Sequence, residues 1–338
     1  ALQRQYALLS RAANAKEAEK RSLEDMLQQI QHEIDADLSD FQVPSEAKPP
    51  VFPISSDRRV MSAGVTILGT GFGFVLVLGL VLLDTRIRSA SELAGKLRYP
   101  VLGTFPRLAD SPNLLRVQNN PILMEQFRMI ARRLRQAIDK TGARILVVSP
   151  RHGEGRSFIS SNLAVCLGRL DEHVLVLDGN VRESKSSAPS LINCQLPSKG
   201  LGDYLSYTAE TFREITSPTD AAGVEYLPCL AEAVAPDMLG TNRMRELLEE
   251  LSRRFSIILM DSPPVSPYVD SELLAQWSDT VLLVIRSQYS DWKTIRKAVQ
   301  RIEGTGRPIV GIILNAVEPA YLDRDEYENY RVMVSGTA

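Results

Sequence analysis

The sequence is poor in the residues that build disulfide frameworks and zinc sites. It contains three cysteines, Cys166, Cys194 and Cys229, which have neither close pairing nor an even count. We expect reduced thiols packed as small apolar side chains. The chain also lacks a charge imbalance, with 39 basic and 41 acidic residues, so composition gives no reason to expect a nucleic-acid partner. Composition leaves soluble and membrane-attached enzymes equally open.

The first 43 residues follow a heptad pattern. Apolar residues from Leu2 to Phe41 alternate at spacings of four and three, which lines one side of a helix, and Lys16 and Lys20 interrupt the pattern. Two arrangements fit: a single amphipathic helix packed on further parts of the protein, or a helical hairpin or coiled coil. One register fills the two core positions with Leu2, Leu9, Leu23 and Ile30, and with Tyr6, Ala13, Leu27 and Ile34.

A proline-rich segment, residues 44–59, leads to a long apolar run. Its prolines cannot sustain helical hydrogen bonding, so we expect an extended connector. Residues 60–83 are 24 residues without a charge, enough to cross a hydrocarbon layer of about 30 Å at about 1.5 Å per residue. A buried core helix is the alternative, but such helices seldom run this long without a polar face. The pattern predicts a transmembrane helix.

The charges that flank this span indicate its orientation. Four basic residues follow it within residues 84–98, the first part of a predicted juxtamembrane linker (84–120), and three precede it. This difference favours a cytoplasmic location for the C-terminal side. The basic residues after the span are Arg86, Arg88, Lys96 and Arg98, and those before it are Lys48, Arg58 and Arg59.

From Arg144 onward, short runs of β-branched apolar residues alternate with helical stretches. This pattern is typical of an α/β fold, a mostly parallel sheet with helices on both faces. Several runs end in a polar residue, and ligands of open parallel sheets bind beyond the carboxyl ends of the strands. The predicted strands are residues 145–149, 174–178, 257–261, 281–285 and 309–314.

The first predicted strand leads into residues 149–157, which read SPRHGEGRS. A glycine-bearing turn that opens a helix after a strand presents backbone N–H groups and a positive dipole end to an anion. The strict P-loop spacing requires glycine where Pro150 stands and lysine where Arg156 stands. Taken alone, this segment fits either a degenerate phosphate-binding loop or an ordinary glycine turn.

Aspartates end the next two strands in chain order, Asp178 in one and Asp261 in the other. A phosphate-bound magnesium ion needs such carboxylates, with Ser157 supplying a hydroxyl. A single strand-end aspartate is more often a turn or helix cap. The joint occurrence of the loop and both aspartates favours a nucleotide and magnesium site.

These segments together resemble bacterial tyrosine kinases fused to polysaccharide co-polymerases of the Wzz/Wzc type. The segments that carry the resemblance span nearly the whole chain: IRSASEL at 87–93, PVLG at 100–103, Pro106, the loop at 153–157, LDGN at 177–180, GLGDYL at 200–205, PDML at 236–239 and DSPP at 261–264. The resemblance implies a P-loop NTPase-like fold for residues 121–318 and binding of ATP or ADP with Mg²⁺. It further implies that this chain belongs to a longer parent protein whose N-terminal part precedes residue 1. Residues 1–43 would then be the last helix of its extracytoplasmic region.

The resemblance also assigns site residues. The nucleotide contacts it implies are Gly153, Glu154, Gly155, Arg156, Ser157 and Phe158; the metal ligands are Ser157, Asp178 and Asp261; and the catalytic residues are Asp178 and Arg156. Two positions depart from the family pattern. Arg156 replaces a compact ammonium with a broad planar guanidinium. Asn180 stands where the family has a second aspartate, and an amide cannot act as a base. We therefore expect impaired or absent kinase activity.

Two further features follow from the resemblance. The acidic tail, residues 319–338, carries Tyr321, Tyr327 and Tyr330, which are phosphoacceptor candidates or ordinary exposed tyrosines. The predicted helix over residues 122–138 carries Glu125, Arg128 and Arg132, which resemble the family's ring-forming contacts, although Ala131 replaces an expected arginine. The alternative for this helix is a solvated basic face that covers the sheet.

The resemblance implies a bacterial inner-membrane regulator of exopolysaccharide or capsule chain length and export. Its implied partners are further copies in a ring, a polysaccharide polymerase, an outer-membrane export channel and a tyrosine phosphatase. Three alternatives stay open: an active tyrosine autokinase, a MinD-like partitioning ATPase, and a scaffold that binds no nucleotide.

Overall fold

The computed structural model describes residues 2–39, 58–108, 120–138, 140–182, 192–230 and 235–335. The four prolines of the predicted connector lie outside these ranges. The chain divides into two compact units, Ala1–Leu76 and Val77–Ala338. The first unit contains α1 (Leu2–Ser39) and most of α2 (Arg58–Leu83), and the second contains a sheet with its helices.

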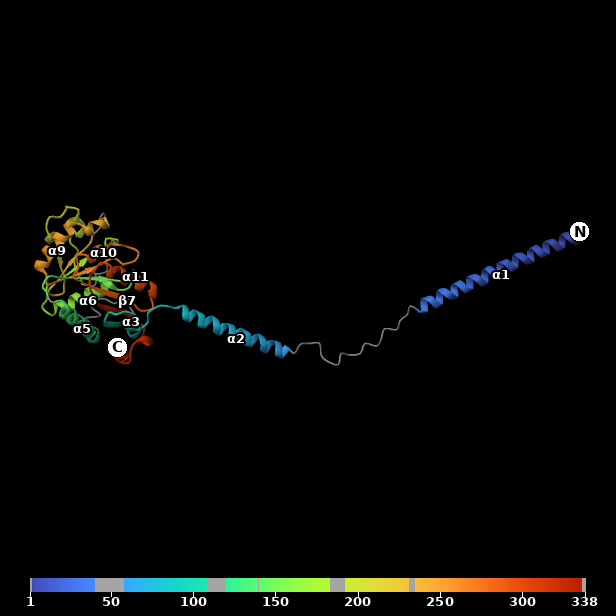
Figure 1. The fold of residues 1–338 in the computed structure, drawn as a ribbon, viewed down its shortest axis with the longest axis horizontal. Coiled ribbons are helices and arrows are strands. Elements are labelled where there is room, and N and C mark those ends of the chain that lie inside the picture. Colours follow the sequence, from blue (N-terminus) through green and yellow to red (C-terminus); the bar gives the residue numbers. More distant parts are fainter. Residues whose placement is uncertain are drawn as a thin grey trace. The chain divides into compact units, whose positions relative to one another are not determined.

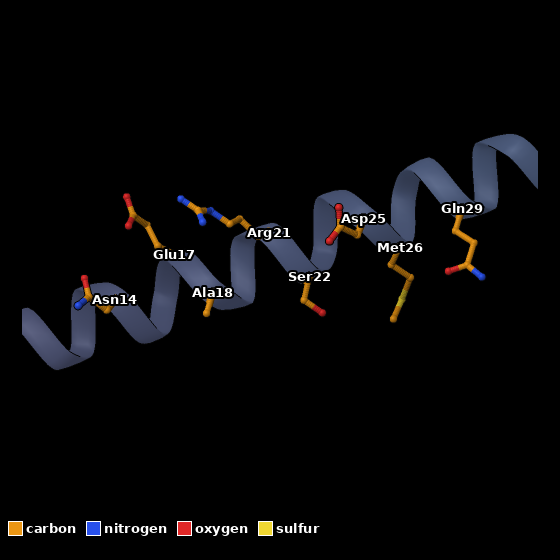
Figure 2. A pocket seen from close by; sticks show the side chains of 8 residues that line it. All are labelled: Asn14, Glu17, Ala18, Arg21, Ser22, Asp25, Met26 and Gln29. Carbon is orange, nitrogen blue, oxygen red and sulfur yellow. The ribbon is translucent and has the colours of Figure 1, made fainter.

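Helix α1 exposes the apolar residues of the predicted heptads. Leu9, Leu23 and Leu27 are each more than half exposed, so this side of the helix has no packing partner within the described residues. A shallow hollow lies along the same helix, and Figure 2 shows the eight side chains that line it. All its lining side chains come from α1, so the hollow is one side of a helix rather than a cavity between elements. The lining residues are Asn14, Glu17, Ala18, Arg21, Ser22, Asp25, Met26 and Gln29.

Helix α2 is the candidate membrane span. Residues Val60–Leu83 form 24 apolar residues with a mean hydropathy of 2.4, and none of that stretch is buried. A helix of this length and composition suits a hydrocarbon environment and not an aqueous one.

The second unit is built on an eight-stranded sheet in the order β1-β8-β7-β2-β6-β3-β5-β4. Every pair is parallel except β4 with β5. The five strands predicted from the sequence are present, which confirms the mostly parallel α/β fold. The strands are β1 (Val101–Pro106), β2 (Ala143–Val148), β3 (Val174–Asp178), β4 (Ser217–Pro218), β5 (Val224–Leu227), β6 (Ile257–Asp261), β7 (Thr280–Arg286) and β8 (Ile309–Val317).

Helices cover both faces of the sheet (Figure 1). Alternate side chains of β2 show the two layers: Ile145 and Val147 pack with α5 and α6, whereas Leu146 and Val148 pack with α9, α10 and α11. The helices of this unit are α3 (Ala90–Lys96), α5 (Pro121–Ala137), α6 (Arg156–Gly168), α8 (Leu201–Leu205), α9 (Asn242–Arg254), α10 (Asp270–Ala275), α11 (Trp292–Glu303), α12 (Arg324–Ser335), and the short η1 (Phe212–Glu214), η2 (Pro236–Gly240) and η3 (Pro319–Tyr321).

Strand β1 comes from the segment that we predicted as a juxtamembrane linker. It pairs in parallel with β8, with Val101 opposite Ile312. Gly103 permits this packing because a Cβ there would lie 2.6 Å from the Ile130 side chain of α5. The chain that leaves α2 thus adds a strand to the sheet.

Candidate functional site

The carboxyl ends of β2, β3 and β6 place the predicted site residues side by side. These strands are neighbours, with β6 between β2 and β3. Asp178 is the register partner of Asp261 across β3 and β6, and Asp261 is opposite Val147 of β2. Because β2 runs directly into the glycine-bearing loop, the loop and both aspartates share one edge of the sheet.

The loop ends in a backbone conformation that glycine alone adopts without strain. Gly155 has φ +96°, and a Cβ there would lie 2.1 Å from Nδ2 of Asn315. Gly155 is also the N-cap of α6 and has no side chain to cap the helix. No side chain therefore caps the start of α6, as at the start of a phosphate-binding loop.

Glu154 holds this loop against the end of β7. Its Oε2 accepts a hydrogen bond from Arg286 N at 2.7 Å, and its Oε1 accepts from Ser290 Oγ at 2.5 Å and from Arg151 N at 3.1 Å. Its carbonyl accepts from Nδ2 of Asn315 at 2.9 Å. The side chain is buried, so its function in this structure is to fix the loop rather than to face solvent.

Burial raises the pKa of Glu154 to about 7, although its three hydrogen-bond donors favour the ionised form. The folded chain therefore binds more protons than the unfolded chain between pH 4.5 and about 7. As the pH rises through this interval, the free energy of unfolding should fall by on the order of 1 to 3 kcal/mol.

The variant Glu154→Gln should remove this pH dependence, because an amide does not titrate. The melting temperature of the full chain in detergent, measured between about pH 5 and about pH 8, checks the prediction. Ser290→Ala is the matched control, since it removes one donor and keeps the carboxyl group. Equal slopes for Glu154→Gln and the unmodified chain would contradict the assignment.

Arg156 and Ser157, the first residues of α6, both meet Asp261. Ser157 Oγ donates to Oδ2 of Asp261 at 2.5 Å, and Nε of Arg156 lies 3.9 Å from Oδ1. Arg156 is 7% exposed and Asp261 3%. The cation that we predicted for the phosphates thus lies beside the carboxylate that we predicted for the metal.

Asp178 accepts two hydrogen bonds at the end of β3. Asn180 N donates to its Oδ1 at 3.0 Å, and the hydroxyl of Tyr226 donates to its Oδ2 at 3.2 Å. The side chain of Asn180 accepts from Arg182 N at 3.3 Å. Arg182 in turn makes a bidentate pair with the buried Asp270, at 2.7 and 3.0 Å.

A cavity of about 390 Å³ lies beside the loop. Aromatic rings and guanidinium groups form its walls: Arg182 lies 4.6 Å from the ring centre of Tyr268, and Arg151 lies 5.6 Å from that of Tyr289. Such walls suit a ligand that is both flat and anionic. The lining residues are Arg151, His152, Asn180, Arg182, Pro264, Ser266, Pro267, Tyr268 and Tyr289.

The side chain of Phe158 packs against α5. Its ring meets Phe127 of α5 edge-on, with ring centres 5.9 Å apart. On α5 the predicted ring-forming residues are at the surface: Arg128 pairs with Glu125 at 3.2 Å, and Arg132 is exposed.

The three tail tyrosines lie on other elements. Tyr321 is half-buried on η3, with the guanidinium of Arg88 5.6 Å from its ring centre. Tyr327 is 43% exposed on α12, and its ring centre is 6.4 Å from that of Tyr330. Met333 is buried with residues of α5, so α12 packs against the sheet domain.

The residues present fit a magnesium nucleotide in part. The uncapped start of α6 suits phosphate, and Ser157, Asp178 and Asp261 bring oxygens to one place. No group of three His, Cys, Asp or Glu suited to a metal occurs in the part of the chain that the structure describes. Magnesium would therefore rely on phosphate and water for most of its ligands.

Sequence reasoning missed several residues of the site. Asn315 lies two residues before the end of β8 and directly after the strand predicted at 309–314, so the strand-end rule could have found it. Tyr226 and Ser290 gave no signal, because their partners in the site, Asp178 and Glu154, are 48 and 136 residues away in the chain.

The fold and the loop define a P-loop NTPase-like α/β protein. No family model matches the chain. It is 25% identical to the tyrosine-protein kinase ptk of Acinetobacter johnsonii over 335 residues, which cover 94% of this chain and 45% of that protein. It is 28% identical to the tyrosine-protein kinase CpsD of Streptococcus agalactiae over 55% of this chain and 80% of that protein.

Solved structures agree with these relatives. The kinase domain of Escherichia coli tyrosine kinase ETK superposes with a TM-score of 0.58 and 25% identity, covering 70% of this chain and 94% of that domain. The chain is therefore homologous to bacterial tyrosine-protein kinases, and its sheet domain has the fold of their kinase domains. It spans less than half the length of the Acinetobacter kinase.

Proposed function

We propose that this chain is part of an inner-membrane regulator of exopolysaccharide or capsule chain length and export. In this proposal its sheet domain binds ATP or ADP with Mg²⁺ and has impaired or absent kinase activity. The relatives support the pathway, because one is described as a putative tyrosine-protein kinase in the cps region of Klebsiella pneumoniae. Helix α2 supports the membrane location.

The observation that carries the proposal is the buried contact of Arg156 with Asp261. A guanidinium 3.9 Å from the carboxylate competes with magnesium for the same negative charge. Its planar shape also fits the space of an ammonium poorly. Asn180, at the edge of the cavity, adds no base.

Each residue of the site then has a defined role with a bound nucleotide. The N–H groups at the start of α6 would hold phosphate oxygens, and Ser157, Asp178 and Asp261 would hold the metal. Glu154 keeps the loop in position. A bound magnesium nucleotide would supply a phosphoryl group, and Asp178 would orient the acceptor hydroxyl.

The full chain in detergent should gain thermal stability from ADP with Mg²⁺. A ligand at about 100 times its dissociation constant stabilises by about 2.7 kcal/mol. Ser157→Ala should remove most of the shift, because it deletes the hydroxyl that lies 2.5 Å from Asp261. Ser160→Ala, one turn along the same helix, is the control.

Two outcomes would change the proposal. If no nucleotide raises the melting temperature of a chain that is folded, the domain is a scaffold without a ligand. If the chain phosphorylates its own tyrosines strongly and Arg156→Ala abolishes the reaction, the kinase is active.

An active autokinase is the second candidate. The exposed Tyr327 and the buried Asp178 favour it, because acceptor and base are both present. Mapping of phosphotyrosine at Tyr321, Tyr327 and Tyr330, in a host without other tyrosine kinases, separates the two functions.

The proposal also places the parts of the chain. Residues 1–43 would be extracytoplasmic, 60–83 would span the membrane, and 121–318 would be cytoplasmic. Further copies would assemble through Glu125, Arg128 and Arg132 into a ring that works with a polymerase, an outer-membrane exporter and a tyrosine phosphatase.

A further inference from the structure

The start of α11 is tied to the chain that leaves the membrane-type helix. Trp292 N donates to the carbonyl of Thr85 at 3.0 Å, and Gln288 N donates to that of Ile87 at 2.8 Å. Thr85 follows Leu83, the last residue of α2, by two residues, which reach at most about 7 Å. The first turn of α11 is therefore close to the end of α2.

One side of α11 is basic and exposed. Lys293, Arg296 and Lys297 are spaced three and four residues apart, so they share one side of the helix, and all three are exposed. The opposite side buries Ile295 and Val299 in the core. These cations have no packing function that would explain their position.

The surrounding acidic groups do not neutralise them. Residues 84–98 and 291–303 each contain four basic and two acidic residues. Asp84 pairs with Arg88, Glu92 with Lys96 and Glu303 with Arg98, while Asp291 caps α11. Among the described residues, Lys293, Arg296 and Lys297 form no ion pair, so this side of α11 keeps its positive charge.

We infer that the side of α11 formed by Lys293, Arg296 and Lys297 binds anionic phospholipid headgroups at the surface of the membrane that α2 enters. The inference rests on the proposed membrane location. Basic helix faces are commonly solvated, but the two-residue link to α2 keeps this one within reach of a bilayer surface. Attraction between such a surface and nearby lysine or arginine is strong enough to hold a domain.

The lipid contact would lie at the edge of the sheet that carries the candidate nucleotide site. The loop between β7 and α11 contains Ser290, which donates to Glu154 of the phosphate-binding loop. It also contains Ser287, whose hydroxyl donates to the carbonyl of Arg88 at 2.9 Å.

Lysine acetylation of the full chain in nanodiscs tests the inference without a mutation. Acetylation of Lys293 and Lys297 should be about five-fold slower in discs with about 30% phosphatidylglycerol than in phosphatidylcholine discs. About 0.5 M salt should restore the rate. Lys140, which pairs with Asp279 beside the start of β7, is the internal control and should not change. Equal rates for Lys293 and Lys297 in both lipids would overturn the inference.

A charge variant adds a second test. Anionic lipid should also slow the acetylation of Lys96, which lies beside the start of α11, 5.6 Å from the Trp292 ring centre. In Lys293→Gln/Arg296→Gln/Lys297→Gln this protection of Lys96 should be lost. Arg169→Gln/Arg213→Gln/Arg253→Gln removes equal charge elsewhere and should keep it. Equal loss in both variants would overturn the inference.

Nucleotide binding, measured in the same discs, distinguishes failure of the lipid inference from failure of the proposed function. A chain that binds ADP but shows no lipid effect retains the proposed nucleotide site and loses the lipid surface. A chain that does not enter discs at all loses both the membrane location and this inference.

Discussion

Replacing Arg156 with lysine and Asn180 with aspartate should together raise the rate of tyrosine autophosphorylation by about 10²-fold or more. The aspartate supplies a general base, which contributes roughly 10²- to 10⁴-fold in enzymes. The lysine supplies a compact ammonium at the position where a guanidinium now lies 3.9 Å from Asp261. Such a base is needed at the edge of the cavity beside the loop, and Asn180 lies at this edge.

The neighbouring residues should accept the aspartate. The side chain of Asn180 accepts a hydrogen bond from Arg182 N, and a carboxylate oxygen can accept the same bond. Asp178, two residues away, would be close to the new charge, and two nearby carboxylates raise the pKa of one of them. A raised pKa suits a group that must accept a proton near neutral pH.

The four-way comparison of unmodified chain, single variants and double variant measures the two contributions. We expect Asn180→Asp to give the larger single gain, because it adds a function, whereas Arg156→Lys refines an existing charge. Initial rates of phosphotyrosine formation with ATP and Mg²⁺ are the readout. Asn14→Asp on the exposed helix α1 adds the same charge in the other unit of the chain and should change nothing.

Two results would count against this account of the site. If the unmodified chain is already as fast as the double variant, then Arg156 and Asn180 do not impair the reaction. If the double variant stays inactive while binding nucleotide, some other feature of the site prevents phosphoryl transfer.

The sequence predicted the central strands well because their apolar runs are long and rich in β-branched residues. It missed β1, where Gly103 and Pro106 interrupt the run, and β5, which has four residues. Both strands owe their place to pairing with distant partners, β8 and β3. Such pairing overrides a weak local preference.

The site could be predicted only as far as local chemistry reaches. The strand-end rule found Asp178 and Asp261, and the glycine turn located the loop. The sequence could not show that Glu154 turns inward to Arg286 and Ser290, because those partners are more than 130 residues away. Nor could it show that Arg156 lies beside Asp261, since an arginine at this position reaches either a phosphate or a carboxylate.

The contact between Arg156 and the Asp261 carboxylate can be measured through stability. Asp261→Ala should lower the free energy of unfolding by about 3 to 5 kcal/mol. Arg156 is 7% exposed, and the variant removes the carboxylate 3.9 Å from its Nε. A guanidinium without that charge nearby is costly to bury. The melting temperature of the full chain should fall by about 10 °C, as 1 kcal/mol corresponds to about 2 to 4 °C at this size.

The double variant Arg156→Met/Asp261→Ala decides whether the loss belongs to this pair. It removes both charges and keeps an apolar side chain of similar length, so most of the stability should return. Glu225→Ala, which removes the partner of Arg254 at the surface, is the control and should cost less than about 1 kcal/mol. If the double variant melts as low as Asp261→Ala, the carboxylate stabilises the domain through Ser157 instead, and Arg156 is free to serve the phosphates.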